Sequence, residues 1–202
     1  MIKMSFYNSI GQPGVAEFKD RGSKFLAYAF PFTDVKELKA IVSKLKKEHS
    51  KAVHFCFAYR IGLLNTICRS SDDGEPAGSA GKPILGQIDS KVLTDVLVVI
   101  VRYFGGTLLG VPGLINAYKT VTSLVLQIVP IIKKPILQYY SLQFDYTQIN
   151  EVITILKLFD CVIGNQQNQL FCNLEIGVPK LRVDDVLHRL KNLRNVEISV
   201  LL

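Results

Sequence analysis

The feature that most constrains the fold is an unbroken aliphatic run, Val96–Val101, near the middle of the chain. A strand with one face in water alternates apolar and polar residues, whereas this run does not alternate at all. It ends at Asp95 and Arg102, and it is far too short to span a bilayer. The run therefore predicts a strand that is covered on both faces.

Length and composition indicate a globular protein without membrane segments. The chain has 202 residues, of which 49% are hydrophobic, which is enough for one large domain or two small ones. Residues 1–14 lack the apolar stretch and cleavage site of a secretory signal, so we expect a cytoplasmic protein. No CxxC pair occurs, and each cysteine lies in an apolar, strand-like stretch. This pattern favours buried free thiols over a zinc site or disulfides at Cys56, Cys68, Cys161 and Cys172.

Positive charge is concentrated in the first part of the chain. Up to Lys134 there are 18 basic and 10 acidic residues, and beyond it 6 basic and 7 acidic residues. A predicted helix places lysines opposite an apolar stripe of Val35, Leu38, Ile41, Val42 and Leu45; these lysines are Lys36, Lys39, Lys44, Lys46 and Lys47. The lysine face is either an ordinary solvated surface or a phosphate-contacting surface of a nucleic-acid or ribosome binder.

The first part, residues 1–134, is predicted to be a mixed α/β domain with the order ββαββαβα. A hairpin of residues 14–19 and 24–32 precedes the lysine helix, which Thr33 or Asp34 caps. Strands at 52–61 and 65–71, a helix at 78–88 with a glycine-rich first turn, and the strand at 96–101 follow. A last helix follows Pro112-Gly113 and ends near Val129, and its buried stripe is Leu114, Ala117, Tyr118, Val121, Leu124 and Val125.

The second part, residues 135–202, is predicted to have the order βαββαβ. A strand at 137–144 leads to a helix from Thr147, then to a hairpin of 161–167 and 170–178 across Asn168-Gln169. A helix with an apolar stripe from Val183 to Leu193 and a strand at 196–202 complete the pattern. Two βαβ halves with matching helices are typical of a ferredoxin-like domain.

The loop Arg69–Pro83 cannot contribute to a core, because it is rich in charge, glycine and proline. Its carboxylates Asp72, Asp73 and Glu75, together with His54, could bind a divalent metal or act as general acid and base. Their spacing matches no established metal loop, so a network of Asx turns and ion pairs that braces the loop, or partner recognition, are the alternatives.

Two further segments could bind anions or bases. Gly78, Ser79 and Lys82 lie at a predicted helix start, where backbone N–H groups could bind an anion or glycine could allow close packing. Lys82 is followed by Pro83, so this is not a Walker A motif. The segment Arg102–Thr107 follows the buried strand: Tyr103 or Phe104 could stack on a base with Arg102 on a phosphate, or both rings could fill the core.

Four segments in one order resemble the signatures of the Impact/YigZ family: His54–Gly62, Arg69–Pro83, Arg102–Gly106 and Gly113–Tyr118. The resemblance implies a ribosomal protein S5 domain 2-like fold for residues 1–134 and a C-terminal domain similar to elongation factor G domain V. It also implies a link to the regulation of translation, with no settled activity for the bacterial members. Leu108 and Asn116 stand where many bacterial relatives carry a lysine and an arginine.

The expected function is therefore that of a non-catalytic, translation-associated protein that binds RNA, the ribosome or a translation factor, without a cofactor or metal. The expected contacts are Arg60, Arg69 and Arg102 for phosphate or an acidic partner, Tyr103 and Phe104 for stacking, Gly78, Ser79 and Lys82 for an anion, and Lys36, Lys39, Lys44 and Lys47 on the helix face. One alternative is a metal-assisted hydrolase that uses His54, Asp72, Asp73 and Glu75. Another is a protein-interaction adaptor that docks through the sheet of the second domain.

Overall fold

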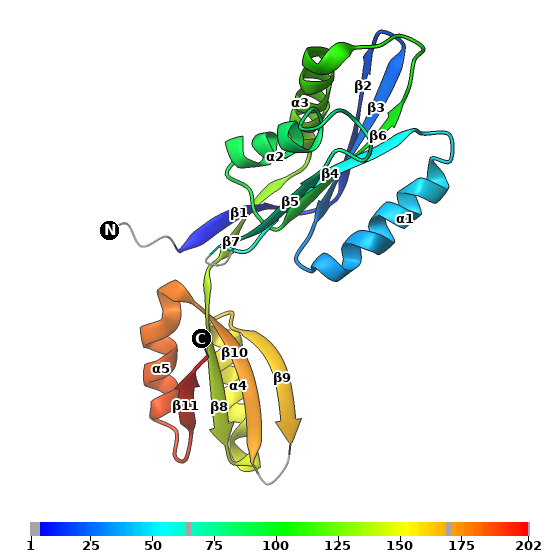
Figure 1. Ribbon diagram of the computed structural model, residues 1–202. Helices are drawn as coiled ribbons and strands as arrows, with labels where there is room; N and C mark the ends of the chain where they lie inside the picture. The colour runs from blue at the N-terminus through cyan, green and yellow to red at the C-terminus, as the bar shows by residue number, and fades with distance from the viewer. Residues whose placement is uncertain (1–4, 64–65, 169–170, 202) are drawn as a thin grey trace. The chain divides into compact units, whose positions relative to one another are not determined.

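The computed structural model describes residues 5–63, 66–168 and 171–201. The chain forms two compact units, one of residues 8–133 and one of residues 1–7 with 134–202 (Figure 1). The mixed α/β class predicted from the sequence is confirmed. Asn65, Gln169, Leu170 and Leu202, which were assigned to predicted strands or a turn, lie outside the described residues.

The first unit is built on a five-stranded sheet in which all neighbouring strands are antiparallel. In spatial order the strands are β2 (Gly14–Asp20), β3 (Ser23–Pro31), β6 (Val96–Tyr103), β4 (His54–Ile61) and β5 (Ile67–Ser71). β6 is the central strand, and the whole run Val96–Val101 is fully buried. The strand covered on both faces is therefore confirmed.

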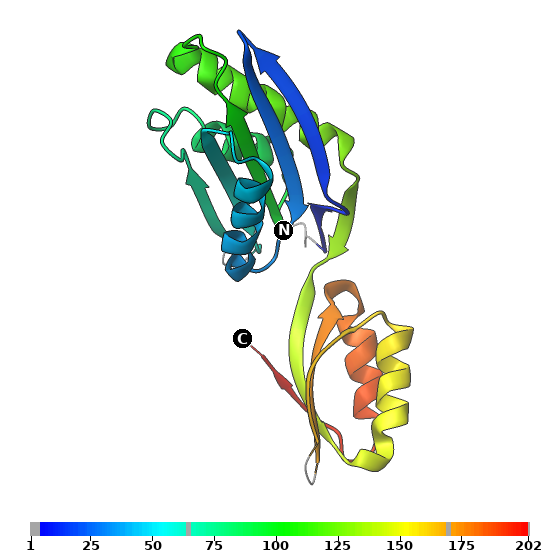
Figure 2. The ribbon, with the colours of Figure 1, turned by 90° about the vertical axis from the view of Figure 1, so that its right-hand side faces the viewer.

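Helices cover both faces of this sheet (Figure 2). α1 (Leu38–Glu48) packs on the face that carries Leu97, Val99 and Val101. α2 (Gly81–Ser90) and α3 (Gly110–Ile128) pack on the opposite face, with Val96, Val98 and Ile100. Because successive residues of β6 face different helices, none of them can be polar without burying an unpaired group, which explains the lack of alternation.

The observed helices differ from the predicted ones in three details. α3 begins at Gly110, before Pro112-Gly113, whereas it was predicted to start after them. α2 begins at Gly81 rather than at Gly78, because residues 78–80 form a loop held by the carboxylate of Asp72. In α3, Leu126 is buried, whereas the predicted Leu124 is only half-buried. The predicted cap before α1 is confirmed, since Asp34 accepts a hydrogen bond from the Lys36 amide at the start of a short 3₁₀ turn, Val35–Glu37.

The second unit has an antiparallel four-stranded sheet with two helices on one face. Along the chain its elements are β8 (Leu137–Phe144), α4 (Ile149–Leu158), β9 (Val162–Asn168), β10 (Cys172–Pro179), α5 (Val183–Lys191) and β11 (Glu197–Val200). The spatial order β11-β8-β10-β9 is that of a ferredoxin-like fold, as the sequence predicted. Its core contains residues of both helices and of β8 and β10, such as Val152, Val186 and Leu142.

One pair of strands was not predicted from the sequence, and two of the cysteines that were predicted to be buried are not. β1 (Phe6–Ile10) and β7 (Ile131–Pro135) form a two-stranded sheet that was not predicted. Cys56 and Cys172 are buried as expected, but Cys68 is exposed, because it lies on the edge strand β5, and Cys161 is half-buried. None of the helices in the described ranges is long and apolar enough to cross a membrane.

Candidate functional site

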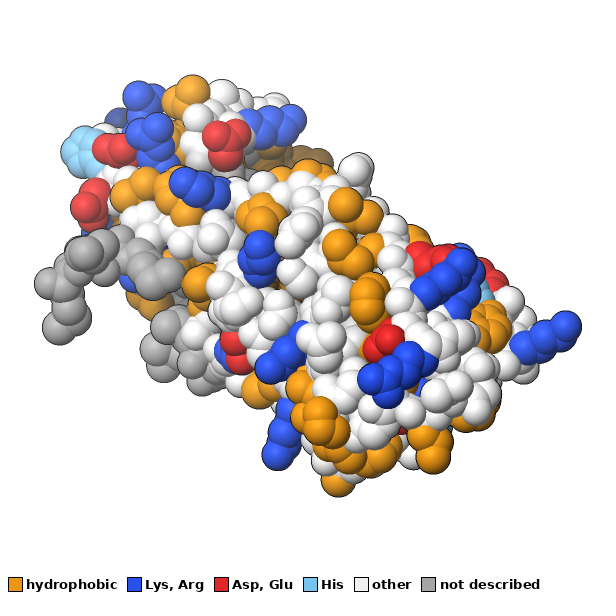
Figure 3. Space-filling view, turned by 90° about the horizontal axis from the view of Figure 1, so that it is seen from above, with side chains coloured by type: hydrophobic (Ala, Val, Ile, Leu, Met, Phe, Trp, Pro, Cys, Tyr) orange, Lys and Arg blue, Asp and Glu red, His pale blue; other side chains and the backbone are white. Residues whose placement is uncertain are grey.

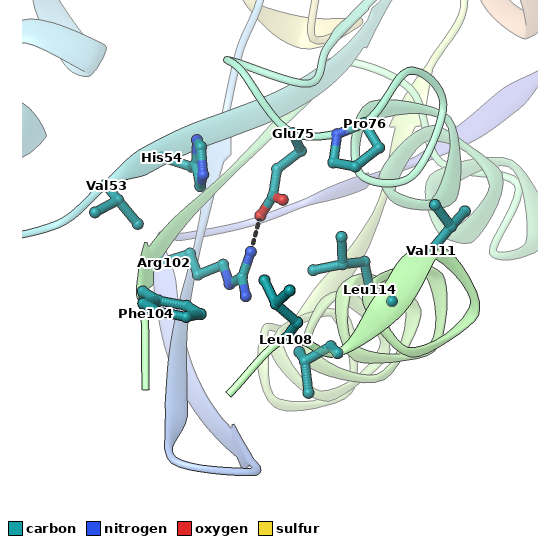
Figure 4. A pocket seen from close by; sticks show the side chains of 11 residues that line it. Val53, His54, Glu75, Pro76, Arg102, Phe104, Leu108, Val111 and Leu114 are labelled. Carbon is teal, nitrogen blue, oxygen red and sulfur yellow. Dashed lines mark hydrogen bonds and ion pairs between the residues drawn. The ribbon is translucent and has the colours of Figure 1, made fainter. Parts of the chain in front are cut away.

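The four signature segments meet at a pocket of about 410 Å³ in the first unit (Figure 4). The start of β4, the loop between β5 and α2, the end of β6 and the start of α3 each contribute to its wall. The lining residues are Val53, His54, Glu75, Pro76, Arg102, Phe104, Leu108, Leu109, Gly110, Val111 and Leu114. The charged loop therefore lies beside Arg102 and Phe104.

A buried ion pair forms the floor of this pocket. Arg102 Nη1 donates to Glu75 Oε1 at 2.6 Å, and the two side chains are only 6% and 3% exposed. The Tyr118 hydroxyl donates to the same Oε1 atom at 2.8 Å. The Cys56 thiol lies 3.3 Å from the Tyr118 oxygen and donates to the Asp72 carbonyl. Burial raises the pKa of both the Cys56 thiol and the Tyr118 hydroxyl, so both groups remain protonated donors.

The Arg102 guanidinium is held between two aromatic rings. It lies 5.4 Å from the centre of the Phe25 ring and 5.9 Å from the centre of the Phe104 ring. Nη2 reaches Ser23 Oγ at 3.5 Å, which is a weak hydrogen bond. Nε is buried and has no hydrogen-bond partner among the described residues. The site thus keeps one donor of a buried cation unsatisfied.

Asp72 organises the loop and the start of α2. Its Oδ1 accepts from the backbone N–H groups of Ala80 and Gly81, and its Oδ2 accepts from Gly78. Burial by itself would raise the pKa of Asp72, but these hydrogen bonds outweigh burial and lower it. The amides that an external anion was expected to bind therefore already hold an internal carboxylate. Ser79 is also engaged, since its hydroxyl donates to the Pro76 carbonyl at 2.6 Å.

His54 and Asp73 form a separate small network. The His54 Nδ1 atom lies 2.8 Å from the Asp73 carbonyl, which indicates that Nδ1 carries the proton. The Asp73 carboxylate accepts from the Phe55 amide at 2.7 Å and lies 3.9 Å from Lys46 Nζ. The candidate metal ligands His54, Asp72, Asp73 and Glu75 are thus each engaged by different partners. Within the described residues, no three histidine, cysteine or acidic side chains are grouped to hold a metal ion.

The structure separates several residues that the sequence analysis grouped together. Arg60 pairs with Asp89 of α2 and lies opposite Val96, at the far end of β4. The residue of β4 that lies opposite Arg102 is His54, six positions before Arg60. At ~3.3 Å per residue, this places Arg60 about 20 Å from that position. Arg69 lies exposed on β5. The predicted cationic positions do not form one patch.

Tyr103 and Phe104 point to opposite faces of the sheet. The Tyr103 hydroxyl lies 2.8 Å from His49 Nδ1 and packs on the α1 side. Phe104 lines the pocket and is 48% exposed. Only one of the two predicted stacking rings is therefore available at this site.

The lysine face of α1 points away from the core. We define the lysine face of α1 as Lys39, Lys44 and Lys47 of the helix together with Lys36 of the 3₁₀ turn that leads into it, all of which are exposed. Four residues of the predicted apolar stripe pack on the sheet, with Leu45 buried and Leu38, Ile41 and Val42 half-buried. The fifth, Val35, is exposed, so its prediction was wrong. Lys44 lies 3.9 Å from Glu48. In the part of the chain that the structure describes, the other three lysines of this face make no ion pair.

Around the pocket mouth, apolar side chains are unusually exposed. Leu108 is 81% exposed, Val53 52% and Val111 46%. On the face of the molecule seen in Figure 3, hydrophobic side chains lie interspersed with lysine and arginine side chains. The mouth of the pocket is thus lined by exposed apolar side chains.

The sequence analysis did not assign Tyr118, Cys56, Ser23 or Phe25 to the site. Tyr118 was placed in the buried stripe of a helix, which is where it lies. A buried tyrosine hydroxyl requires a hydrogen-bond partner. Because Tyr118 also lies in a signature segment, these two features together were the available signal that its hydroxyl belongs to the site. Ser23 and Phe25 come from a distant hairpin, and nothing local in the sequence connects them to Arg102.

Comparisons with known proteins match this region and most of the chain. A family model described as the Impact N-terminal domain matches residues 21–126. The chain is 35% identical over 163 residues to "IMPACT family member YigZ" of Escherichia coli (strain K12), which covers 80% of each protein. It is 41% identical over 137 residues to "IMPACT family member in pol 5'region" of Thermus thermophilus, which covers 67% of this chain and 72% of that protein.

A solved structure described as "Crystal structure of an hypothetical protein" is similar over both units. It superimposes with a TM-score of 0.81 and 29% sequence identity, and the alignment covers 98% of each chain. The four segments that line the pocket all fall within residues 21–126, the range matched by the family model.

Proposed function

Since the chain belongs to the IMPACT family, we propose that it is a translation-associated regulator that binds RNA, the ribosome or a translation factor without bond-making chemistry of its own. The family resemblance implies the link to translation. The observation that carries the binding role is the lysine face of α1, which presents positive charge on a rigid, well-packed helix.

Exposed lysines on a fixed helix favour phosphate groups over most other partners. An ammonium group attracts phosphate without regard to base sequence, because the interaction is electrostatic. A helix held by a buried stripe loses little conformational freedom when it binds. The lysine face of α1 therefore suits a nucleic-acid backbone or an acidic protein surface.

The contacts of the loop carboxylates support a binding role over a hydrolase. Asp72 is engaged by three backbone amides, and Glu75 by Arg102 and Tyr118. A metal ion would have to displace these partners, and a displaced Arg102 would become an unpaired buried charge. We therefore do not favour the hydrolase alternative.

The proposal is tested by cosedimentation of the full-length protein with purified ribosomes at two salt concentrations. We expect the protein to sediment with ribosomes at low salt and to be released at high salt, since counterion release makes such binding salt-dependent. Replacing the lysine face of α1 by glutamine should abolish cosedimentation. A matched variant with four exposed lysines on other elements replaced, Lys119, Lys133, Lys157 and Lys180, should keep it.

The adaptor alternative predicts a different result. In that case a protein partner should copurify after nuclease treatment, and binding should survive the loss of the lysine face. Absence of cosedimentation at every salt concentration, or equal loss in both lysine variants, would contradict the proposal.

A further inference from the structure

We propose that the pocket beside Phe104 binds one unpaired nucleobase of a single-stranded RNA, stacked on the Phe104 ring with its polar edge on the Glu75–Arg102 pair. The inference rests on the proposed function and specifies which group of the RNA the first unit holds. It is argued from the walls of the pocket, from its floor and from the charges beside it.

The walls of the pocket match the faces of a base. Phe104 presents an aromatic ring that is 48% exposed, and Leu108, Val111 and Leu114 supply aliphatic surface around the same cavity (Figure 4). Flipped or unpaired bases are held by stacking between aromatic and apolar side chains. The pocket volume of about 410 Å³ lies within the usual range for small-ligand sites.

The floor of the pocket matches the edge of a base. Glu75 Oε1 accepts from both Arg102 and Tyr118, and the described contacts leave Oε2 free to accept another donor. Arg102 is 5% exposed, and its Nε–H has no partner in the described part of the chain. Every nucleobase presents a donor next to an acceptor on its Watson–Crick edge. A base can therefore donate to Glu75 while its acceptor faces the Arg102 guanidinium.

An apolar side chain of a partner protein fits this floor less well. It would fill the walls, but it would exclude water from Glu75 Oε2 and leave that carboxylate oxygen without a partner. Leaving such charged groups unsatisfied weakens binding. The floor therefore favours a flat ligand with a polar edge.

Positive charge adjoins the pocket on the side of α1. His54, a residue of the pocket wall, bonds to the Asp73 carbonyl, and the Asp73 carboxylate lies 3.9 Å from Lys46 Nζ. Lys46 also lies over the Phe55 ring, 5.3 Å from its centre. The end of α1 thus reaches the edge of the pocket. An RNA strand whose base enters the pocket can place a phosphate near Lys46.

The test measures the affinity of the full-length protein for a single-stranded oligouridylate of about 12 nucleotides, a length typical of such sites, by fluorescence anisotropy. One probe carries a central 2-aminopurine, and a second probe of the same length is abasic at every position, so that no base can enter the pocket. The variants are Phe104→Leu, which keeps apolar bulk but removes the ring, and Phe104→Tyr, which keeps the ring.

For the intact probe we expect Phe104→Leu to weaken binding by about 5-fold to 150-fold, the range of base–aromatic stacking. Phe104→Tyr should bind like the wild type. The wild type should bind the abasic probe more weakly than the intact probe. Phe104→Leu and the wild type should bind the abasic probe with equal affinity. Stacking should also quench 2-aminopurine fluorescence in the wild type. The slope of affinity against salt should not change, because no phosphate contact is lost.

Leu108→Glu provides a second variant that does not depend on the stability of the Phe104 position. Leu108 is 81% exposed, so the fold tolerates the change, whereas a carboxylate at the pocket mouth should repel the RNA strand and weaken binding.

Equal affinity of the intact and abasic probes for the wild type would overturn the inference. If that binding still requires the lysine face of α1, the proposed function stands, and the pocket then takes another ligand, such as a protein side chain. Absence of any RNA binding would contradict the inference directly, whereas ribosome cosedimentation would still test the proposed function.

Discussion

At the scale of single residues, the buried pair of Glu75 and Arg102 connects the loop, the central strand and α3. Removing one partner of a buried ion pair leaves an uncompensated charge, so we expect Glu75→Ala to lower the free energy of unfolding by about 3–5 kcal/mol. Urea denaturation measures this loss. The double variant Glu75→Leu/Arg102→Leu should recover most of it, because no charge remains buried. A loss below about 1 kcal/mol for Glu75→Ala would match an exposed pair instead.

Asp72 gives the loop a pH-dependent contribution to stability. Although burial opposes ionisation, the hydrogen bonds from Gly78, Gly81 and Ala80 lower the pKa of Asp72 in the folded state. A carboxyl with a lowered folded pKa adds stability above its unfolded pKa, about 3.9, and that stability is lost as the pH falls through the folded pKa.

We therefore expect Asp72→Asn to destabilise the protein at pH 7 by about 1–3 kcal/mol, the range for hydrogen bonds to a charged group. The difference from the wild type should shrink as the pH falls below about 4, the unfolded pKa. Denaturation midpoints measured between pH 2 and pH 7, from about two units below that pKa to about three units above it, check this. Asp34→Asn is the control, since Asp34 is exposed and accepts only one backbone hydrogen bond. A pH-independent difference for Asp72→Asn would contradict the account.

At the scale of the elements, the turn between β2 and β3 packs directly against the segment after β6. A Cβ on Gly105 would lie 1.8 Å from the backbone carbon of Gly22, which no shift of a side chain can relieve. We expect Gly105→Ala to displace this turn and to destabilise the first unit by more than about 2 kcal/mol, as overpacking against backbone does. The measurement is thermal unfolding.

Gly86→Ala is the matched control, because a Cβ there meets nothing within 4 Å and the residue lies within α2. It should stabilise the protein by about 0.5–1 kcal/mol, the helical advantage of alanine over glycine. Equal effects of Gly105→Ala and Gly86→Ala would show that the close approach at Gly105 is unimportant.

Elements with a strong periodic pattern were predictable from the sequence, and contacts over long range were not. The lysine helix and the ferredoxin-like half follow apolar spacings that are local to the chain, and the structure confirms them. β1 and β7 were missed because each is short and pairs with a strand more than a hundred residues away. The start of α2 was misplaced because it depends on Asp72, outside the helix. The same limit applies to the site, where Tyr118 reaches Glu75 and Ser23 reaches Arg102 only through the fold.

At the scale of the whole molecule, the two units have separate cores. Leu142 belongs to a cluster formed within the second unit, and Val98 to one formed within the first. Leu142→Ala should cost about 2–5 kcal/mol in the second unit. Hydrogen exchange should then accelerate for β8–β11 and stay unchanged for β2–β6, and Val98→Ala should give the reverse pattern. Acceleration over the whole chain in either variant would show that the units unfold together.

The central claim is that the lysine face of α1 binds phosphate groups. The most direct measurement is the dependence of RNA affinity on salt for the wild type and for the variant with Lys36, Lys39, Lys44 and Lys47 replaced by glutamine. If all four lysines contact phosphates, the slope of log K against log[salt] should become shallower by about 3 in the variant, from ~0.7 per phosphate on a single strand. An unchanged slope would contradict the claim, because phosphates would then be bound elsewhere on the protein.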